Sequence, residues 1–268
     1  MLKDVTLGQF FPGKSLIHRL DPRTKLIILV GYIVALFLAV SWLSYGVVFV
    51  FLSICIAISQ IPLKSFFKGM KPLIFILIFT GVLNILFTQG ETVLVHFWKI
   101  TITLEGLIRA FFMIFRILLL ITGTFLLTYT TSPIALTDGL ESLLSPLKKI
   151  KLPVHELSMM MCIALRFIPT LIEETDKIMS AQKARGADFE SGKLMERIKA
   201  LVPILVPLFI SAFRRADELA TAMECRCYQG GEGRTKMKLL RMRSYDYYSF
   251  LVSAVVIAGV CVLRSFGL

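Results

Sequence analysis

The chain has 268 residues, of which 56% are hydrophobic and 18% charged, and its mean hydropathy is +0.76. Soluble domains carry about a quarter charged residues, so this composition excludes an ordinary soluble domain, a disordered chain and a small disulfide-stapled fold. The net charge of +12 is informative mainly through its distribution along the chain. The sequence predicts an all-α protein that crosses a membrane several times.

Five uncharged or nearly uncharged runs are suited to membrane-spanning helices, because about 20 residues of helix cross the roughly 30 Å of hydrocarbon. In chain order they cover residues 26–42, 45–61, 73–88, 107–130 and 247–263. A turn is expected at 41–44, between the first two. The charged segment that precedes the first run has no apolar core before a small-residue site, so no cleavable signal peptide is expected.

Basic residues lie almost entirely on one side of this arrangement. Residues 1–25, 62–72 and 131–245 carry 26 of the 30 Lys and Arg residues. Because short connections rich in Lys and Arg stay in the cytoplasm, we expect a multi-pass plasma-membrane protein with a cytoplasmic N-terminus and an external C-terminus. We predict three domains. Residues 1–130 form the N-terminal segment and the first four spans, residues 131–245 form a cytoplasmic coupling domain with two helices that end on arginine, and residues 246–268 form the last span.

Two shorter apolar stretches in the cytoplasmic segment could be mistaken for spans. Residues 157–172 are interrupted by Arg166 and Pro169, and residues 201–213 contain two prolines. Treating them as a pair of spans would place the basic segment 173–200 outside, against the charge rule. We therefore interpret both as apolar faces of long cytoplasmic helices that lie against the membrane domain.

An internal repeat supports the two-helix interpretation. Residues 178–186 align with residues 219–227, and each copy ends on an arginine between two small residues. The two triplets are Ala184, Arg185, Gly186 and Cys225, Arg226, Cys227. We expect Gly186 to end the first helix, and Gly230, Gly231 and Gly233 to end the second.

Each triplet presents a guanidinium at a predicted helix end. Its five N–H donors, flanked by small residues, suit insertion into an acidic or carbonyl-lined pocket of another protein. The alternative is that each arginine only complements the negative end of its own helix, which is worth about 0.3–1 kcal/mol. Two arginines at matched positions favour docking.

Arg116 is the most informative polar residue within the predicted spans. Counted from residue 107 at about 1.5 Å per residue, it lies near the middle of the fourth span, where an arginine costs about 2.5–3.5 kcal/mol on insertion scales. No acidic residue occurs in any of the five runs. A backbone carbonyl, Asn84 or a partner subunit must therefore satisfy its guanidinium.

Motifs for catalysis or cofactor binding are not found in the sequence. It has no G-x-x-x-x-G-K-[ST] phosphate loop, and its three histidines are isolated from other metal ligands. A membrane enzyme should pair reactive residues at the membrane boundary, where the candidates are Asp21 and Asp246. A self-contained secondary carrier should show inverted repeats of spans, whereas the repeat here is cytoplasmic.

Several segments also carry a family resemblance: SLIHRLDPRTKL at 15–26, LTYTTSP at 127–133, LPVHEL at 152–157, RFIP at 166–169 and AQKARG at 181–186. In this order and spacing they resemble the transmembrane T component of energy-coupling factor (ECF) transporters, the CbiQ-like family. The similarity covers nearly the whole chain.

The resemblance implies a non-catalytic scaffold and energy-coupling subunit of an ABC-type importer for vitamins or other micronutrients. In that family the T component links two cytoplasmic ATPase subunits, where ATP and Mg are expected, to a membrane-embedded S component that binds the substrate. Two Ala-Arg-Gly motifs dock on the ATPases. Residues 184–186 match the first motif, whereas Cys225 and Cys227 replace the residues that flank the arginine in the second.

Apolar residues of the first cytoplasmic helix are candidates for the S-component interface. They are Leu157, Met159, Met160, Met161, Ile163 and Leu165. Methionine adapts to irregular partners, which suits a surface that accepts several of them. The alternative is that these residues fill the protein's own core.

Overall fold

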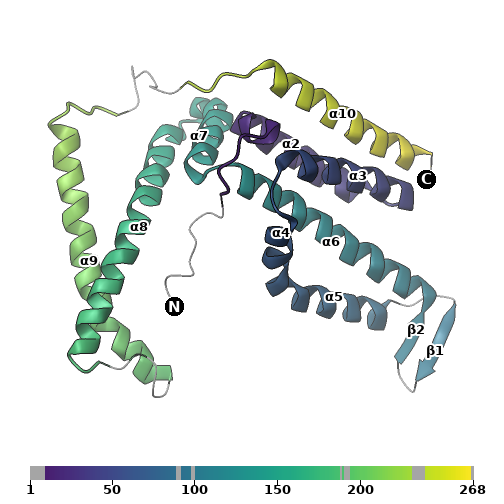
Figure 1. Cartoon of the computed structure of the whole chain (residues 1–268), viewed down its shortest axis with the longest axis horizontal. Helices are drawn as coiled ribbons and strands as arrows, with labels where there is room; N and C mark the ends of the chain where they lie inside the picture. The colour runs from purple at the N-terminus through teal and green to yellow at the C-terminus, as the bar shows by residue number, and fades with distance from the viewer. Residues whose placement is uncertain are drawn as a thin grey trace. The chain divides into compact units, whose positions relative to one another are not determined.

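The structure is a computed structural model that describes residues 10–88, 92–97, 100–187, 189, 194–230 and 239–266. Its elements are α1 (Leu16–Arg19), α2 (Pro22–Leu38), α3 (Trp42–Ser59), α4 (Leu63–Met70), η2 (Lys71–Leu73), α5 (Ile74–Phe87), β1 (Val93–Phe97), β2 (Ile100–Thr103), α6 (Leu104–Thr130), α7 (Pro133–Leu144), η3 (Ser145–Ile150), α8 (Val154–Ala184), α9 (Leu194–Glu224) and α10 (Ser244–Ser265). The predicted all-α membrane architecture is confirmed (Figure 1).

Contacts divide the chain into two compact units. The bundle unit contains the described residues of 8–139 and 240–268, and the two-helix unit contains those of 140–239. The limits of these two units follow from contacts between residues. The limits predicted from the sequence, at 130/131 and 245/246, describe placement relative to the membrane and stay a prediction.

Five helical segments of the described chain are long and apolar enough to cross a bilayer: α3, Leu63–Phe87, α6, α8 and α10. Four of them overlap predicted spans. The remaining predicted span, 26–42, corresponds to α2, which has 17 residues and packs against α6 and α10. Length and composition do not distinguish a spanning α8 from a cytoplasmic one.

The connection between α2 and α3 lies earlier than the sequence suggests. Helix α2 ends at Leu38, and the Ser41 hydroxyl caps α3 by accepting a hydrogen bond from the Ser44 backbone N–H. The predicted turn at 41–44 is therefore wrong, because Ser44 already belongs to α3. Serine favours both helix N-caps and turns, so composition alone could not separate the two.

A short β-hairpin before α6 was not predicted. Strands β1 and β2 pair antiparallel, with Val93 opposite Thr103 and Phe97 opposite Ile100. Both strands are rich in β-branched residues, which favour extended backbone. The Thr103 hydroxyl then caps α6 by accepting from the Gly106 N–H, so the hairpin leads directly into the longest helix of the bundle unit.

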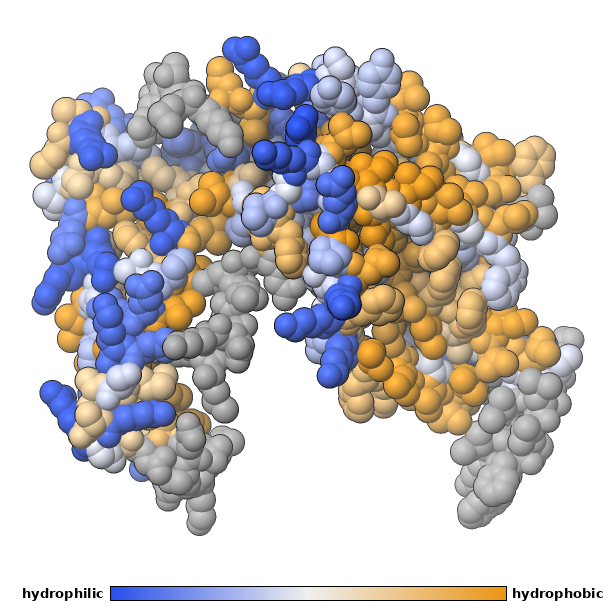
Figure 2. Space-filling view, viewed as in Figure 1, coloured by the Kyte–Doolittle hydropathy of each residue, from blue (hydrophilic) through white to orange (hydrophobic). Residues whose placement is uncertain are grey.

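The core of the bundle unit forms where α2, α3, α6 and α10 meet. Leu36, Val48 and Val260 are fully buried there. The Tyr32 hydroxyl donates to the Leu119 backbone oxygen at 2.8 Å. Figure 2 shows a largely hydrophobic surface over the bundle helices and a mixture of charged and apolar residues over α8 and α9.

Candidate coupling site

Helix α8, which carries the first arginine triplet, ends at Ala184, and Gly186 terminates it as the sequence predicts. This glycine has φ +88°, and its N–H donates to the Lys183 carbonyl while the Ala187 N–H donates to the Gln182 carbonyl. This pair of bonds is the Schellman arrangement, in which the residue after the cap adopts left-handed backbone. Arg185 is therefore the C-cap residue of α8.

The end of α9 has the same geometry but not the predicted terminator. The Cys227 N–H donates to the Glu224 carbonyl, the Tyr228 N–H donates to the Met223 carbonyl, and Cys227 has φ +56°. The assignment of the helix end to the later glycines is therefore wrong. Cysteine is an uncommon residue at positive φ, which is why the sequence did not reveal this terminator.

The two arginines thus occupy equivalent places at two equivalent helix ends. Arg185 precedes Gly186 and Arg226 precedes Cys227, and the second residue of each pair is left-handed. Both arginine side chains are exposed. Neither guanidinium has a salt bridge to another residue of the described chain, so both are available to a partner.

The two helices contact one another at equivalent positions of the repeat. Glu174 of α8 accepts hydrogen bonds from the Ser211 hydroxyl and, at 3.0 Å, from the Arg215 guanidinium of α9. Glu174 precedes Arg185 by 11 residues, and Arg215 precedes Arg226 by the same number. The contact between Glu174 and Arg215 therefore lies about 16 Å of helix from each arginine. Figure 1 shows α8 and α9 side by side, running in opposite directions.

Prolines do not interrupt these helices. α8 runs through Pro169, and α9 runs through Pro203 and Pro207. A proline inside a helix removes one backbone hydrogen bond and favours a kink, but the apolar stretches that contain these prolines stay helical. All three prolines precede the contact of Glu174 with Arg215, so the segments that connect this contact to the two arginines contain no proline.

The apolar candidates on α8 are only partly covered in the described structure. Leu157, Met160 and Met161 are 49%, 55% and 52% exposed, and Met159, Ile163 and Leu165 are half-buried. None of the six side chains is buried among the described residues, so they do not form a hydrophobic core there.

The apolar face of α9 was predicted from residues 201–213, but the sequence did not assign it to a partner. Its members are between 47% and 68% exposed: Leu201, Val202, Leu205, Val206, Phe209, Ile210 and Phe213. Their spacing of one, three and four residues follows one side of a helix. That spacing was the available signal, and it identifies a larger exposed apolar surface than the methionines of α8.

Arg116 is satisfied within the bundle unit. Its Nε donates to the Tyr45 hydroxyl at 2.8 Å, and its terminal nitrogen donates to the Ala39 carbonyl at 3.1 Å. The guanidinium also lies 5.7 Å from the ring centres of Phe37 and Tyr45. Because Ala39 caps the C-terminal end of α2, the arginine meets an otherwise unpaired carbonyl at the negative end of a helix. The Asn84 side chain donates elsewhere, to groups on α5 and α6.

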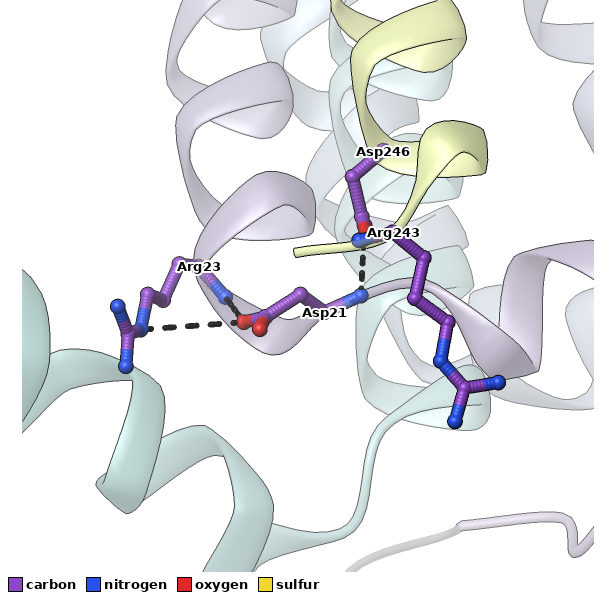
Figure 3. Close-up of polar contacts among 4 residues, drawn as sticks. All are labelled: Asp21, Arg23, Arg243 and Asp246. Carbon is purple, nitrogen blue, oxygen red and sulfur yellow. Dashed lines mark hydrogen bonds and ion pairs between the residues drawn. The ribbon is translucent and has the colours of Figure 1, made fainter. Parts of the chain in front are cut away.

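The two aspartates singled out as enzyme candidates do come together (Figure 3). The Asp246 carboxylate accepts from the backbone N–H groups of Asp21, at 2.8 Å, and Arg243, at 2.7 Å. The Asp21 carboxylate accepts from the Arg23 N–H at 3.0 Å. Both carboxylates are therefore engaged in capping α2 and α10, an arrangement that holds two helix starts together and does not resemble an acid–base pair.

Comparison with known proteins gives the family. The CbiQ family, described as cobalt transport protein, matches residues 13–237. The chain belongs to the CbiQ family. The resemblance to T components of ECF transporters drawn from the sequence is thereby confirmed.

Relatives match over almost their full length. Proteins called energy-coupling factor transporter transmembrane protein EcfT from Clostridium kluyveri and Thermosediminibacter oceani are 55% and 52% identical, over 96% and 98% of this chain and 96% and 99% of theirs. The protein of that name from Bacillus subtilis is 50% identical over 97% of this chain and 98% of its own length. Among the described residues, no group of three or more His, Cys, Asp or Glu gathers that could hold a metal ion.

Proposed function

We propose that this chain is the transmembrane scaffold and energy-coupling subunit of an ECF importer, linking two cytoplasmic ATPase subunits to a membrane-embedded S component. The observation that carries the proposal is the pair of equivalent helix ends, each presenting an exposed arginine without a salt bridge in the described chain. Family membership and the names of the relatives support it.

The geometry suggests how motion would pass from the ATPases to the membrane. If each ATPase subunit holds one arginine, closure of the ATPase pair on ATP moves the two helix ends relative to each other. The contact of Glu174 with Ser211 and Arg215 lies at the same distance from both ends, so it serves as the pivot. Each partner must bind the two states with different affinity for this coupling to operate.

Charge supports a cytoplasmic α8 and α9. Placing α8 across the membrane would carry the basic segment 173–200 to the outside, against the positive-inside rule. With α2 as the first span instead, the N-terminal segment, residues 62–72 and both arginine ends share the cytoplasmic side.

The exposed apolar faces of α8 and α9 are the proposed S-component interface. The face on α9 around Phe209 and the methionines of α8 are too exposed for isolated cytoplasmic helices. An apolar membrane partner would bury them. ATP and Mg belong to the ATPase subunits, this subunit is not an enzyme, and the S component decides which vitamin or other micronutrient is taken up.

The test is a charge reversal at both helix ends. Arg185→Glu combined with Arg226→Glu should leave folding and membrane insertion intact, yet abolish ATPase co-purification and substrate uptake, because a carboxylate would replace each guanidinium and would be repelled by an acidic or carbonyl-lined pocket. Lys199→Glu combined with Arg214→Glu is the matched control, since both residues are exposed on α9 but lie away from its end. Normal ATPase retention in the first variant would overturn the proposal.

A further inference from the structure

A cavity of about 370 Å³ lies within the bundle unit and plays no part in the coupling role. α1, α2, α3, α6 and α10 all contribute to its wall. The lining is almost entirely apolar, apart from a few groups that include Lys25. Its volume falls within the range of ligand sites, about 300–1,000 Å³.

The exposed part of the cavity wall belongs mainly to α3 and α10. Lining residues such as Tyr32 of α2 and Gly123 of α6 are buried. On α3 and α10 the lining includes exposed residues, with Ile54 at 53%, Tyr248 at 70% and Val252 at 50%, beside the buried Leu52 and Ser253, and Leu16 of α1 is 53% exposed. Both α3 and α10 are long and apolar enough to cross a membrane, so we place this part of the opening against lipid.

The cavity wall extends along the helices. It is lined from Lys25 to Tyr32 on α2 and from Gly123 to Thr130 on α6, which is about 10 Å in each case. An apolar slot of this length beside lipid accommodates a segment of an acyl chain.

One end of the slot carries Lys25, whose ammonium interacts electrostatically with the buried carboxylates of Asp21 and Asp246. Lys25, 7% exposed, donates to the Thr130 carbonyl at 2.9 Å and to the Thr131 hydroxyl at 3.1 Å. An ammonium has three N–H donors, and no third acceptor for Lys25 is found among the described residues. The remaining donor is free for an oxygen of a ligand in the slot.

Two further cations flank the same end. Arg19 directly precedes the lining residue Leu20, and Arg243 lies two residues before the lining residue Tyr245. Both side chains are exposed, and neither has a salt bridge to a described residue. The bond between the Asp21 N–H and Asp246 keeps the starts of α2 and α10 together (Figure 3), so the backbone at both arginines lies near the Lys25 end of the cavity, which we call its rim.

We propose that this slot binds one anionic phospholipid, with an acyl chain between α3 and α10 and its phosphate end at Lys25, Arg19 and Arg243. The apolar wall supplies affinity for the chain, and the cations supply the preference for an anionic headgroup, since each basic residue near a lipid surface contributes attraction. The site is independent of the proposed ATPase docking.

The experiment is native mass spectrometry of the full chain, purified in mild detergent and exchanged with phosphatidylglycerol or phosphatidylcholine. Wild-type protein should retain one phospholipid and prefer phosphatidylglycerol by roughly tenfold. Cys55→Phe places a ring in the slot and should reduce retained phosphatidylglycerol by roughly tenfold or more. Cys261→Phe is the matched control, because Cys261 is exposed on α10 and does not line the cavity.

The rim is tested separately. Arg19→Gln combined with Arg243→Gln should retain a phospholipid but bring the two headgroups to nearly equal binding, whereas Arg264→Gln, at the opposite end of α10, should change nothing. Equal lipid retention by Cys55→Phe and Cys261→Phe would overturn the proposed slot. Equal binding of both lipids by wild-type protein would overturn its anionic character. Unfolding midpoints exclude misfolding, and Leu127→Trp fills the same cavity if Cys55→Phe does not fold.

Discussion

Asp246 offers the sharpest test of how the bundle unit is held together. It is 1% exposed, and its two carboxylate oxygens accept the backbone N–H groups of Asp21 and Arg243 at 2.8 and 2.7 Å. Asp246→Ala removes both acceptors, one from a buried bond with the Asp21 N–H and one from a partly buried bond with the Arg243 N–H. A buried donor without a partner costs about 1–3 kcal/mol, so we predict a loss of this size from the Asp21 N–H and a smaller one from the Arg243 N–H, which water can reach.

Asp246→Asn refines the estimate of what each bond contributes. The amide keeps one acceptor oxygen but turns an NH₂ group toward the other N–H, so about half of the loss is expected. The free energy of unfolding would be measured by denaturant titration in detergent, with helicity as the signal. Asp138→Ala is the control, since Asp138 lies in the same unit, is half-buried and has no side-chain hydrogen bond to a described residue. If Asp246→Ala were no less stable than this control, the reasoning would be refuted.

Three more predictions concern the helix ends and contacts. Cys227→Gly should keep ATPase binding and stabilise the end of α9 by about 0.5–1 kcal/mol, whereas Cys227→Val should weaken ATPase co-purification, since a β-branched residue resists positive φ; equal binding by both would contradict this. Arg215→Glu should weaken the α8–α9 contact by about 1 kcal/mol, and adding Glu174→Arg should restore most of the uptake in vesicles; no recovery would argue against a pivot there. Gly123→Ala should lower the free energy of unfolding by about 1–3 kcal/mol, because its Cβ would lie 2.6 Å from the Tyr32 ring; an unchanged free energy would show that the ring moves aside without cost.

Much of the helical architecture was predictable because it depends on local composition. Apolar runs of helix-spanning length indicated α3, α5, α6 and α10, and the 41-residue repeat indicated two further helices that end on arginine. The errors arose where two local structures share one composition. Ser41 belongs to a helix cap rather than a turn centre, and the hairpin before α6 was hidden between two long apolar runs.

The candidate site was predictable in its residues but not in its geometry. Arg185 and Arg226 stand out in the sequence because each sits at the end of a repeated pattern. Cys227 has the left-handed backbone conformation that Gly186 has at the end of α8. The sequence did not predict this, because glycine adopts that conformation more readily and several glycines follow Cys227. The apolar face on α9 was predicted from residues 201–213, but hydropathy does not say what covers such a face, and only its exposure in the structure indicates an interface.

The sequence alone determined that this is a polytopic helical membrane protein with two arginine-ended helices on its basic side. Those properties follow from hydropathy, charge and short-range spacing, which act within a few residues of one another. Only the tertiary structure decided that Glu174 meets Arg215, that Arg116 meets the end of α2, and that Asp246 holds the start of α2 from 225 residues away. Such contacts depend on how distant helices pack, and no local pattern encodes the choice of partner.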